Sequence, residues 1–322
     1  MKAISRRYDP ERDFLRVRDM LSETYAQFDK PLNWTIERWQ YARHFCAPML
    51  GAYGLGTASD NSLKDNIEKS KQAIRLWESA ICIWENEQDG IAGVVCPDEY
   101  VPWHPGSGLA FFQRRPGYDH LLSEMLDYAI KKYVWRGISS VWVPSHDAAL
   151  SIAAQQRGFK PSDKGLEYWL EIDLAGLPHG HLPEGFTLQS MADNNDLEKR
   201  RKIFGLSFYH KDPKEWPTVF SYQELQRAPD YREDLDLAVV APDGEFVSCC
   251  IAWVDMHNKI AMLEPVGSIV LGMGREVVME GLRRARALGA QIGIMTTSLK
   301  YYEKIGFMKK YPYGIKWRKN VS

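Results

Sequence analysis

The chain has 322 residues, of which 45% are hydrophobic and 26% charged, a composition typical of folded, water-soluble proteins. Its formal net charge is −1, so it lacks the excess of positive charge expected of a protein whose main partner is nucleic acid. No stretch reaches the roughly 18–20 apolar residues that span a bilayer, and the first residues contain no apolar core of signal-peptide length. We therefore expect a cytoplasmic protein without a membrane partner, long enough for two domains.

The five cysteines give no sign of a disulfide framework or a metal site. Their number is odd and no two have CxxC spacing, so neither paired cysteines nor a zinc site is predicted. Cys249 and Cys250 are adjacent, so a strand would direct them to opposite faces, and we interpret both as packing residues.

The first half of the chain starts with helical material at 8–21. A β-hairpin is predicted at 80–97, because Asp89-Gly90 lies between two β-rich runs and Asp-Gly is a strong signal for a tight turn. An insertion at 46–75 lengthens this half. The remaining predicted elements are a strand (108–113), an amphipathic helix (118–137), a strand (138–144), a helix ending in Gly-Phe (149–159) and an aromatic-rich strand (166–174).

The second half repeats this order. Its helical start is 190–204, and its hairpin is 237–254 with Asp243-Gly244 at the turn. The elements that follow are a strand (259–267), an amphipathic helix (274–290), a strand (291–295), a helix ending in Gly-Phe (299–307) and a strand (314–319). The order predicts a mixed α+β fold in two tandem domains, 1–178 and 179–322, joined by the Pro/Gly-rich segment 175–185.

This order, with "EPVG" at 264–267 before a glycine-containing turn and "YYEKIGF" at 301–307, resembles the GNAT (GCN5-related N-acetyltransferase) superfamily. The duplication resembles the tandem-GNAT proteins of that superfamily. The resemblance implies that each half has a mixed, mostly antiparallel central sheet flanked by helices. It also implies acetyl-coenzyme A as the cofactor.

In that family a turn of pattern Gln/Arg-x-x-Gly-x-Gly/Ala opens a helix and binds the pyrophosphate of coenzyme A, because free N–H groups and the helix dipole attract phosphate oxygens. Ile269 stands where the family has Gln or Arg, and the loop is a few residues short. In the first half Asp119 replaces the small residue of the motif, so we expect that half to be a poor cofactor site. The matching segment of the second half, "LGMGRE", implies cofactor binding by Leu271, Gly272, Met273, Gly274 and Arg275.

The strand "MLEPVGS" matches the family strand that separates from its neighbour and exposes backbone N–H groups to the thioester oxygen. The resemblance places Val266, Gly267 and Ser268 in this role. Glu264 is positioned either to accept a proton from the ammonium substrate or to be an edge carboxylate bonded to a neighbouring strand. Asp255 is a weaker alternative base.

The family also has a tyrosine that donates a proton to the departing thiolate. Alignment on Gly306-Phe307 places Tyr302 at that position, whereas the first half has Ala154 there. The alternative is that Tyr302 is a core aromatic residue. Since neighbouring helical residues point about 100° apart, Tyr301 is expected to serve packing or the acceptor pocket instead.

The segment after the opening helix of the second half commonly shapes the acceptor pocket in this fold. It contains Tyr209, Trp216 and Tyr222, with His210 beside them. These residues either line an aromatic pocket for a cationic or flat acceptor or pack between the halves.

The expected function is acyl-CoA-dependent N-acyl transfer, from acetyl-CoA to an amine of a small molecule or peptide, by a monomer or homodimer. The alternative is a catalytically inactive GNAT-like module that binds a ligand or regulates a partner. A third interpretation, an aminoacyl-tRNA donor, fits less well because no basic stripe is present.

Overall fold

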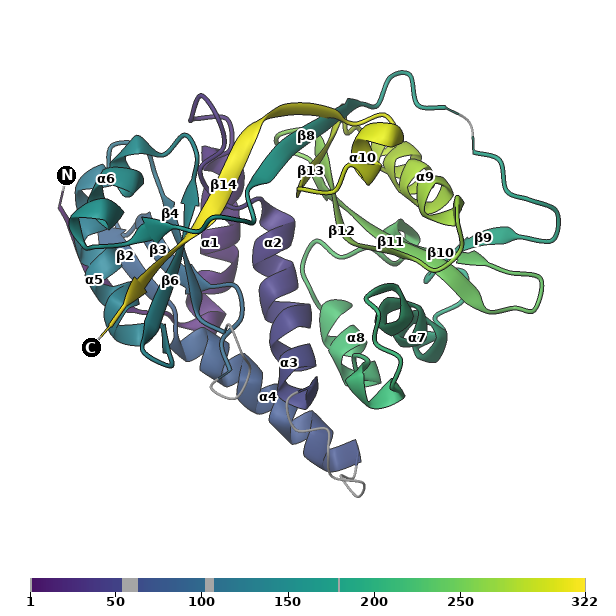
Figure 1. Cartoon of the computed structure of the whole chain (residues 1–322), viewed down its shortest axis with the longest axis horizontal. Coiled ribbons are helices and arrows are strands. Elements are labelled where there is room, and N and C mark those ends of the chain that lie inside the picture. Colours follow the sequence, from purple (N-terminus) through teal and green to yellow (C-terminus); the bar gives the residue numbers. More distant parts are fainter. Residues whose placement is uncertain (1, 54–62, 102–106, 179, 322) are drawn as a thin grey trace.

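A computed structural model describes residues 2–53, 63–101, 107–178 and 180–321 (Figure 1). The first half contains most of its helices between its first two strands. Its elements are β1 (Ala3–Arg7), α1 (Pro10–Thr24), α2 (Ile36–Tyr41), a π-helical turn (Ala42–Cys46), α3 (Ala47–Tyr53), α4 (Leu63–Ser79), β2 (Cys82–Asn86), β3 (Ile91–Pro97), β4 (Leu109–Arg114), a 3-10 turn (Asp119–Leu121), α5 (Leu122–Lys132), β5 (Val134–Trp135), β6 (Ile138–Pro144), α6 (Ala148–Gln156), β7 (Lys160–Pro161) and β8 (Glu167–Asp173).

The second half is built around a sheet with α9 on one face and α7 and α8 on the other (Figure 1). Its elements are β9 (Thr187–Ser190), α7 (Leu197–Ser207), a 3-10 turn (Pro213–Glu215), α8 (Val219–Leu225), a 3-10 turn (Glu233–Leu235), β10 (Asp236–Val240), β11 (Phe246–Asp255), β12 (Ile260–Ser268), α9 (Met273–Ala287), β13 (Ile292–Thr297), α10 (Tyr301–Lys304) and β14 (Met308–Asn320). Residue 179, where the second domain is expected to begin, lies outside the described residues.

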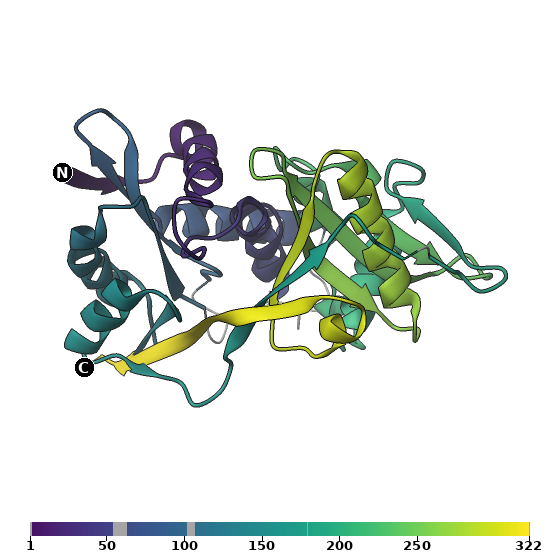
Figure 2. The same ribbon diagram turned by 90° about the horizontal axis from the view of Figure 1, so that it is seen from above.

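The strands of the two halves form one continuous sheet. Within the described residues the strand order is β1-β2-β3-β4-β6-β14-β8-β13-β12-β11-β10-β9, with β5 beside β6 and β7 beside β14. β8 therefore pairs with β13 of the second half, whereas β14 crosses to pair with β6 of the first (Figure 2). Each half contributes its last strand to the other, an exchange that the sequence analysis did not predict.

Both predicted hairpins are confirmed. β2 and β3 are antiparallel around Asp89, which has a positive φ of 57°, and β10 and β11 are antiparallel around Gly244. The predicted insertion at 46–75 contains α3 and part of α4, and residues 54–62 of it lie outside the described residues. The helix predicted at 118–137 is shorter than expected, because the chain turns into β5 after α5.

The apolar stripes of the two amphipathic helices form the cores. All four apolar residues predicted for the inner face of α9 are fully buried, and all five predicted for α5 and the turn before it are buried; they are Val277, Val278, Leu282 and Ala285, and Leu121, Leu122, Met125, Leu126 and Ala129. Burying a large aliphatic side chain contributes about 1.5–3 kcal/mol, so these stripes hold the helices on the sheet. Among the described residues, no helix is both long and apolar enough to cross a membrane.

Candidate active site

The parallel strands β12 and β13 separate partway along their length. Their pairing runs from Ile260–Ile292 to Met262–Ile294 and stops, although β12 continues to Ser268 and β13 to Thr297. We call the space between these unpaired ends, 263–268 and 295–297, the strand opening. The separation coincides with a β-bulge at which two residues of β12, Glu264 and Pro265, lie opposite one residue of β11.

The far end of β12 presents backbone N–H groups to this opening. The N–H of Ile269 donates to the carbonyl of Val247 on β11 at 3.0 Å. Since N–H groups alternate along a strand, Gly267 also faces β11, and the N–H groups of Val266 and Ser268 point to the side without a strand. Gly267 has a separate packing role, because a Cβ there would lie 2.6 Å from the Cβ of Ser207.

The loop before α9 has the geometry of a small anion-binding turn. Gly272 has a φ of 89°, which favours glycine, and its carbonyl accepts from the N–H of Arg275 at 3.1 Å. The N–H groups of Leu271, Gly272 and Gly274 have no partner among the described residues. Gly274 allows close approach, because a Cβ there would lie 2.8 Å from the Tyr301 hydroxyl.

The charged residue of this loop is already paired. The Arg275 guanidinium contacts Glu276 at 2.6 Å, and the other Glu276 oxygen accepts from the N–H of His181 at 2.7 Å. Ile269 and Leu271 are exposed apolar side chains, with Leu271 fully exposed. A ligand would therefore meet backbone N–H groups in this loop rather than a free cation. The side chain of Met273, predicted to bind cofactor, packs in the core.

Tyr302 lies at the start of α10, against the opening. Its ring packs edge-on against Phe307, with 5.7 Å between ring centroids, and 6% of the residue is exposed. Burial raises the pKa of its phenol above the ordinary value. No hydrogen bond joins its hydroxyl to another described residue, and it lines the cavity described next. The ring of Tyr302 therefore packs in the core while the residue also lines the cavity, so both interpretations of Tyr302 apply.

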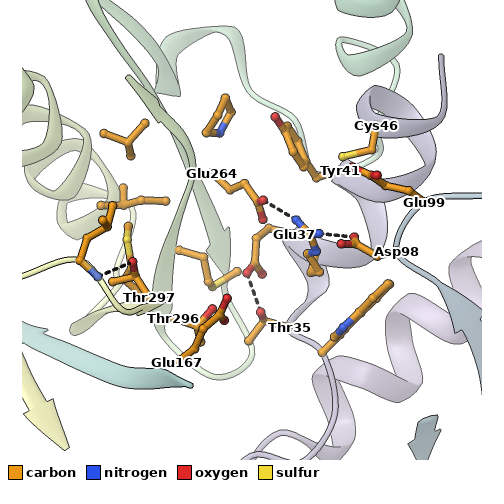
Figure 3. Close-up of a pocket in the computed structure, with 18 of the residues that line it drawn as sticks. Thr35, Glu37, Tyr41, Cys46, Asp98, Glu99, Glu167, Glu264, Thr296 and Thr297 are labelled. Carbon is orange, nitrogen blue, oxygen red and sulfur yellow. Dashed lines mark hydrogen bonds and ion pairs between the residues drawn. The ribbon is translucent and has the colours of Figure 1, made fainter. Parts of the chain in front are cut away.

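A cavity of about 720 Å³ extends from the strand opening to the helices of the first half. Its apolar wall is largely aromatic, with Trp34, Phe111, Trp142, Trp169 and Tyr313. Its polar wall is acidic, and Figure 3 shows carboxylates from α2, the turn after β3, β8 and β12 around one space. The carboxylates that line it are Glu37, Asp98, Glu99, Glu167, Glu215 and Glu264.

Arg38 supplies the guanidinium among the described lining residues. It forms ion pairs with Glu264 and with Asp98, so it bridges β12 and the first half (Figure 3). Burial raises the pKa of Glu264, and Arg38 opposes that rise. The predicted base is thus on the cavity wall and is paired with a cation; its backbone carbonyl also accepts from the Trp253 indole at 2.7 Å.

The structure brings His210 to the cavity wall but not the other residues predicted for the acceptor site. Tyr209 is 92% exposed, Trp216 packs on Gly205 of α7, and Tyr222 is buried with its hydroxyl accepting from Arg200 at 3.2 Å. Asp255 lies at the opposite end of β11, where its carboxylate accepts from the Ser22 hydroxyl and from Asn258.

The sequence analysis missed the contribution of α2. Trp34, Glu37, Arg38 and Tyr41 all line the cavity. Glu37, Arg38 and Tyr41 lie on one face of α2, whereas Trp34 precedes the helix, which begins at Ile36. Two opposite charges beside an aromatic residue on that face were a usable signal, since such a face is too polar for an ordinary core.

The equivalent opening of the first half is filled by its own chain. β4 and β6 pair only at Leu109–Ser140 and Ala110–Val141. Beyond this point Asn33 accepts from the N–H of Arg114 at 2.9 Å and donates to its carbonyl at 2.8 Å. The Arg114 guanidinium is buried and binds Asp147 at 2.7 and 2.9 Å and Asp119 at 2.6 Å. Asp119, the carboxylate that replaces the small residue of the family motif, is therefore one side of an ion pair.

No family model and no curated protein matches the chain. Solved structures do. A tandem GNAT protein from the clavulanic acid biosynthesis pathway superposes with a TM-score of 0.58 at 12% identity, covering 100% of this chain and 98% of that one. A GCN5-related N-acetyltransferase from Sphaerobacter thermophilus gives 0.53 at 15% identity, covering 87% and 92%.

N-myristoyltransferase from Saccharomyces cerevisiae, solved with bound myristoyl-CoA, gives a TM-score of 0.53 at 11% identity, covering 99% of this chain and 79% of that one. Identities this low support a statement about fold rather than activity. The strand opening, the glycine turn before α9 and the duplicated order of elements agree with that likeness. The chain therefore has the GNAT fold, arranged as two tandem GNAT-like domains.

Proposed function

We propose that the chain is an acyl-CoA-dependent N-acyltransferase that transfers acetyl from acetyl-CoA to an amine, with its chemistry in the second of two domains, 1–178 and 179–322. The observation that carries this proposal is the strand opening. It joins free backbone N–H groups, a phenol and a carboxylate to a cavity large enough for a small acceptor.

The cofactor would be held at the second half alone. The N–H groups of Leu271, Gly272 and Gly274 at the start of α9 are suited to phosphate oxygens, and those of Val266 and Ser268 to a thioester carbonyl. When bound, acyl-CoA supplies an acyl group activated as a thioester, whose C–S bond breaks as the bond to the acceptor nitrogen forms. Filling of the first opening by Asn33 supports the assignment to one half.

Two side chains would handle protons. Glu264 accepts the proton of the acceptor ammonium, directly or through water, so that the nitrogen lone pair becomes available. The Tyr302 hydroxyl holds a proton at the cavity wall for the leaving sulfur, and its buried position keeps it protonated at neutral pH. Both residues line the same cavity, which supports this division of roles.

A second candidate function is a GNAT-like module that binds a ligand without catalysis. It is favoured by the loop before α9, where Ile269 and Leu271 are exposed and Arg275 is paired with Glu276. Such a loop lacks the free cation that would strengthen binding of a pyrophosphate.

Calorimetry with acetyl-CoA and with free coenzyme A distinguishes the two. An acyltransferase is expected to bind both, and to release free thiol when acetyl-CoA is mixed with an amine panel. Binding without thiol release would support the module, and absence of binding at millimolar ligand would remove the cofactor from the proposal.

A further inference from the structure

The acidic cavity contains a carboxylate oxygen that the folded chain leaves without a partner. Glu37 is 8% exposed; its Oε1 accepts from the Thr35 hydroxyl at 2.5 Å, whereas its Oε2 is buried and has no hydrogen bond. A buried, unpartnered carboxylate oxygen costs about 1–3 kcal/mol or more, so its retention on a cavity wall indicates that something outside the chain pairs with it.

A second carboxylate on the same cavity also lacks a partner. The side chain of Glu167, on β8, forms no hydrogen bond or ion pair with another described residue. Burial raises the pKa of Glu37 to about 8 and that of Glu167 to about 7, because their negative charges are removed from water and the charge of Arg38 opposes the rise only in part. Arg38 forms no ion pair with either carboxylate, since its guanidinium is engaged by Asp98 and Glu264.

We propose that the acceptor is a small di- or polyamine: one amine is acylated at the strand opening while a second ammonium group is bound by Glu37 and Glu167. The aromatic wall formed by Trp34, Trp142 and Tyr313 is suited to the methylene chain between the two charges and to the cation itself. The acylation step rests on the proposed function, whereas the binding of the second ammonium group does not.

The arrangement also distinguishes substrate from product. Acylation converts one ammonium group into a neutral amide, so the total positive charge of the acceptor falls by one. A cavity lined by six carboxylates and one guanidinium among its described residues holds the less charged product more weakly. Product release is therefore favoured by the same groups that select the substrate.

The test is calorimetry on the full chain without cofactor, using 1,4-diaminobutane, butylamine and N-acetyl-1,4-diaminobutane. We expect the diamine to bind at least about tenfold more tightly than either monocation, with an affinity that falls as salt rises. Glu37→Gln and Glu167→Gln should each weaken diamine binding about tenfold and butylamine binding little. Glu184→Gln, an exposed carboxylate without a partner among the described residues, should change neither.

Equal affinities for the diamine and butylamine would overturn the proposal, as would unchanged diamine binding in Glu37→Gln. A trilysine peptide serves as a further arm, and tighter binding of the peptide than of the diamine would overturn the assignment to a small amine. Failure of the proposed function would give a different result. The diamine would still bind, and Glu37→Gln would still weaken that binding, but no thiol would be released from acetyl-CoA.

Discussion

The two halves share one strand arrangement and differ in what occupies the strand opening. The N–H of Arg115 donates to Ala92 as that of Ile269 donates to Val247, so the N–H of the preceding residue points into the opening in both. In the first half this is Arg114, whose N–H donates to Asn33. In the second half it is Ser268, whose N–H by this alternation points away from β11 into the opening.

The difference shows that separated strands are not in themselves a binding site. In the first half the opening is closed by Asn33, by the indole of Trp34, whose centroid lies 4.7 Å from that of Phe111, and by the buried Arg114–Asp147 pair. In the second half the same geometry leads to a cavity with Tyr302 and Glu264 on its wall. The residues that fill the opening, rather than the fold, decide whether it can hold a cofactor.

The largest expected effect is a loss of stability on replacing Arg114, the buried arginine of the first half. Arg114→Met leaves Asp147 buried without its partner, which is expected to lower the free energy of unfolding by about 3–5 kcal/mol. Arg275→Met in the second half removes a more exposed pair and should cost less than about 1 kcal/mol. Urea unfolding of both variants measures this contrast, and equal losses would remove the distinction between the two arginines.

The next largest effect concerns cofactor binding. Gly274→Asp places a side chain where the Tyr301 hydroxyl lies and a negative charge beside the free N–H groups, so acetyl-CoA affinity should fall at least about 100-fold. Gly176→Asp is the matched control, because nothing lies within 4 Å of a Cβ at that exposed position. Equal acetyl-CoA affinities of the two variants by calorimetry would show that the loop before α9 does not bind the cofactor.

A smaller effect is expected for the phenol that the first half lacks. Tyr302→Phe keeps the packing against Phe307 and removes the hydroxyl, so turnover should fall about 10- to 100-fold with cofactor affinity unchanged. Steady-state rates and calorimetry separate these quantities. Turnover equal to that of the parent would make Tyr302 a core residue like its counterpart Ala154.

The smallest effect is a change in how stability depends on pH. Burial raises the pKa of Glu37 from 4.5 to about 8, with Thr35 and Arg38 opposing the rise and Glu264 adding to it. The folded state then holds a proton that the unfolded state releases, so the free energy of unfolding falls as pH rises from about 5 to 8.

Glu37→Gln should remove this part of the fall, since the amide does not ionise. The variant is expected to match the parent near pH 5 and to be about 1–3 kcal/mol more stable near pH 8, by urea unfolding without ligand. A residual fall remains, because burial also raises the pKa of Glu99 and Glu167 to about 7. If the difference in unfolding free energy between variant and parent were the same from pH 5 to pH 8, Glu37 would not be the group with the raised pKa.

The sequence predicted what depends on local pattern. Asp-Gly turns gave both hairpins, the apolar spacing of α9 gave its buried face, and "EPVG" marked the strand that separates from its neighbour. The exchange of β8 and β14 was not predicted, because an aromatic strand has the same alternation whichever sheet it joins. The acidic cavity was missed for a related reason: Glu37 and Glu167 are 130 positions apart, and only the tertiary arrangement places them on one wall.

The exchange of the last strands has a consequence for how the chain folds during synthesis. β6 lies near the middle of the chain and pairs with residues 314–320 of β14, which are synthesised almost last. The first half therefore keeps an unpaired sheet edge during most of synthesis. Pairings of such sequence separation form slowly, and an unpaired edge is a site of association with other chains. Separate expression of residues 1–178 should therefore give a protein that aggregates until β14 is supplied in trans.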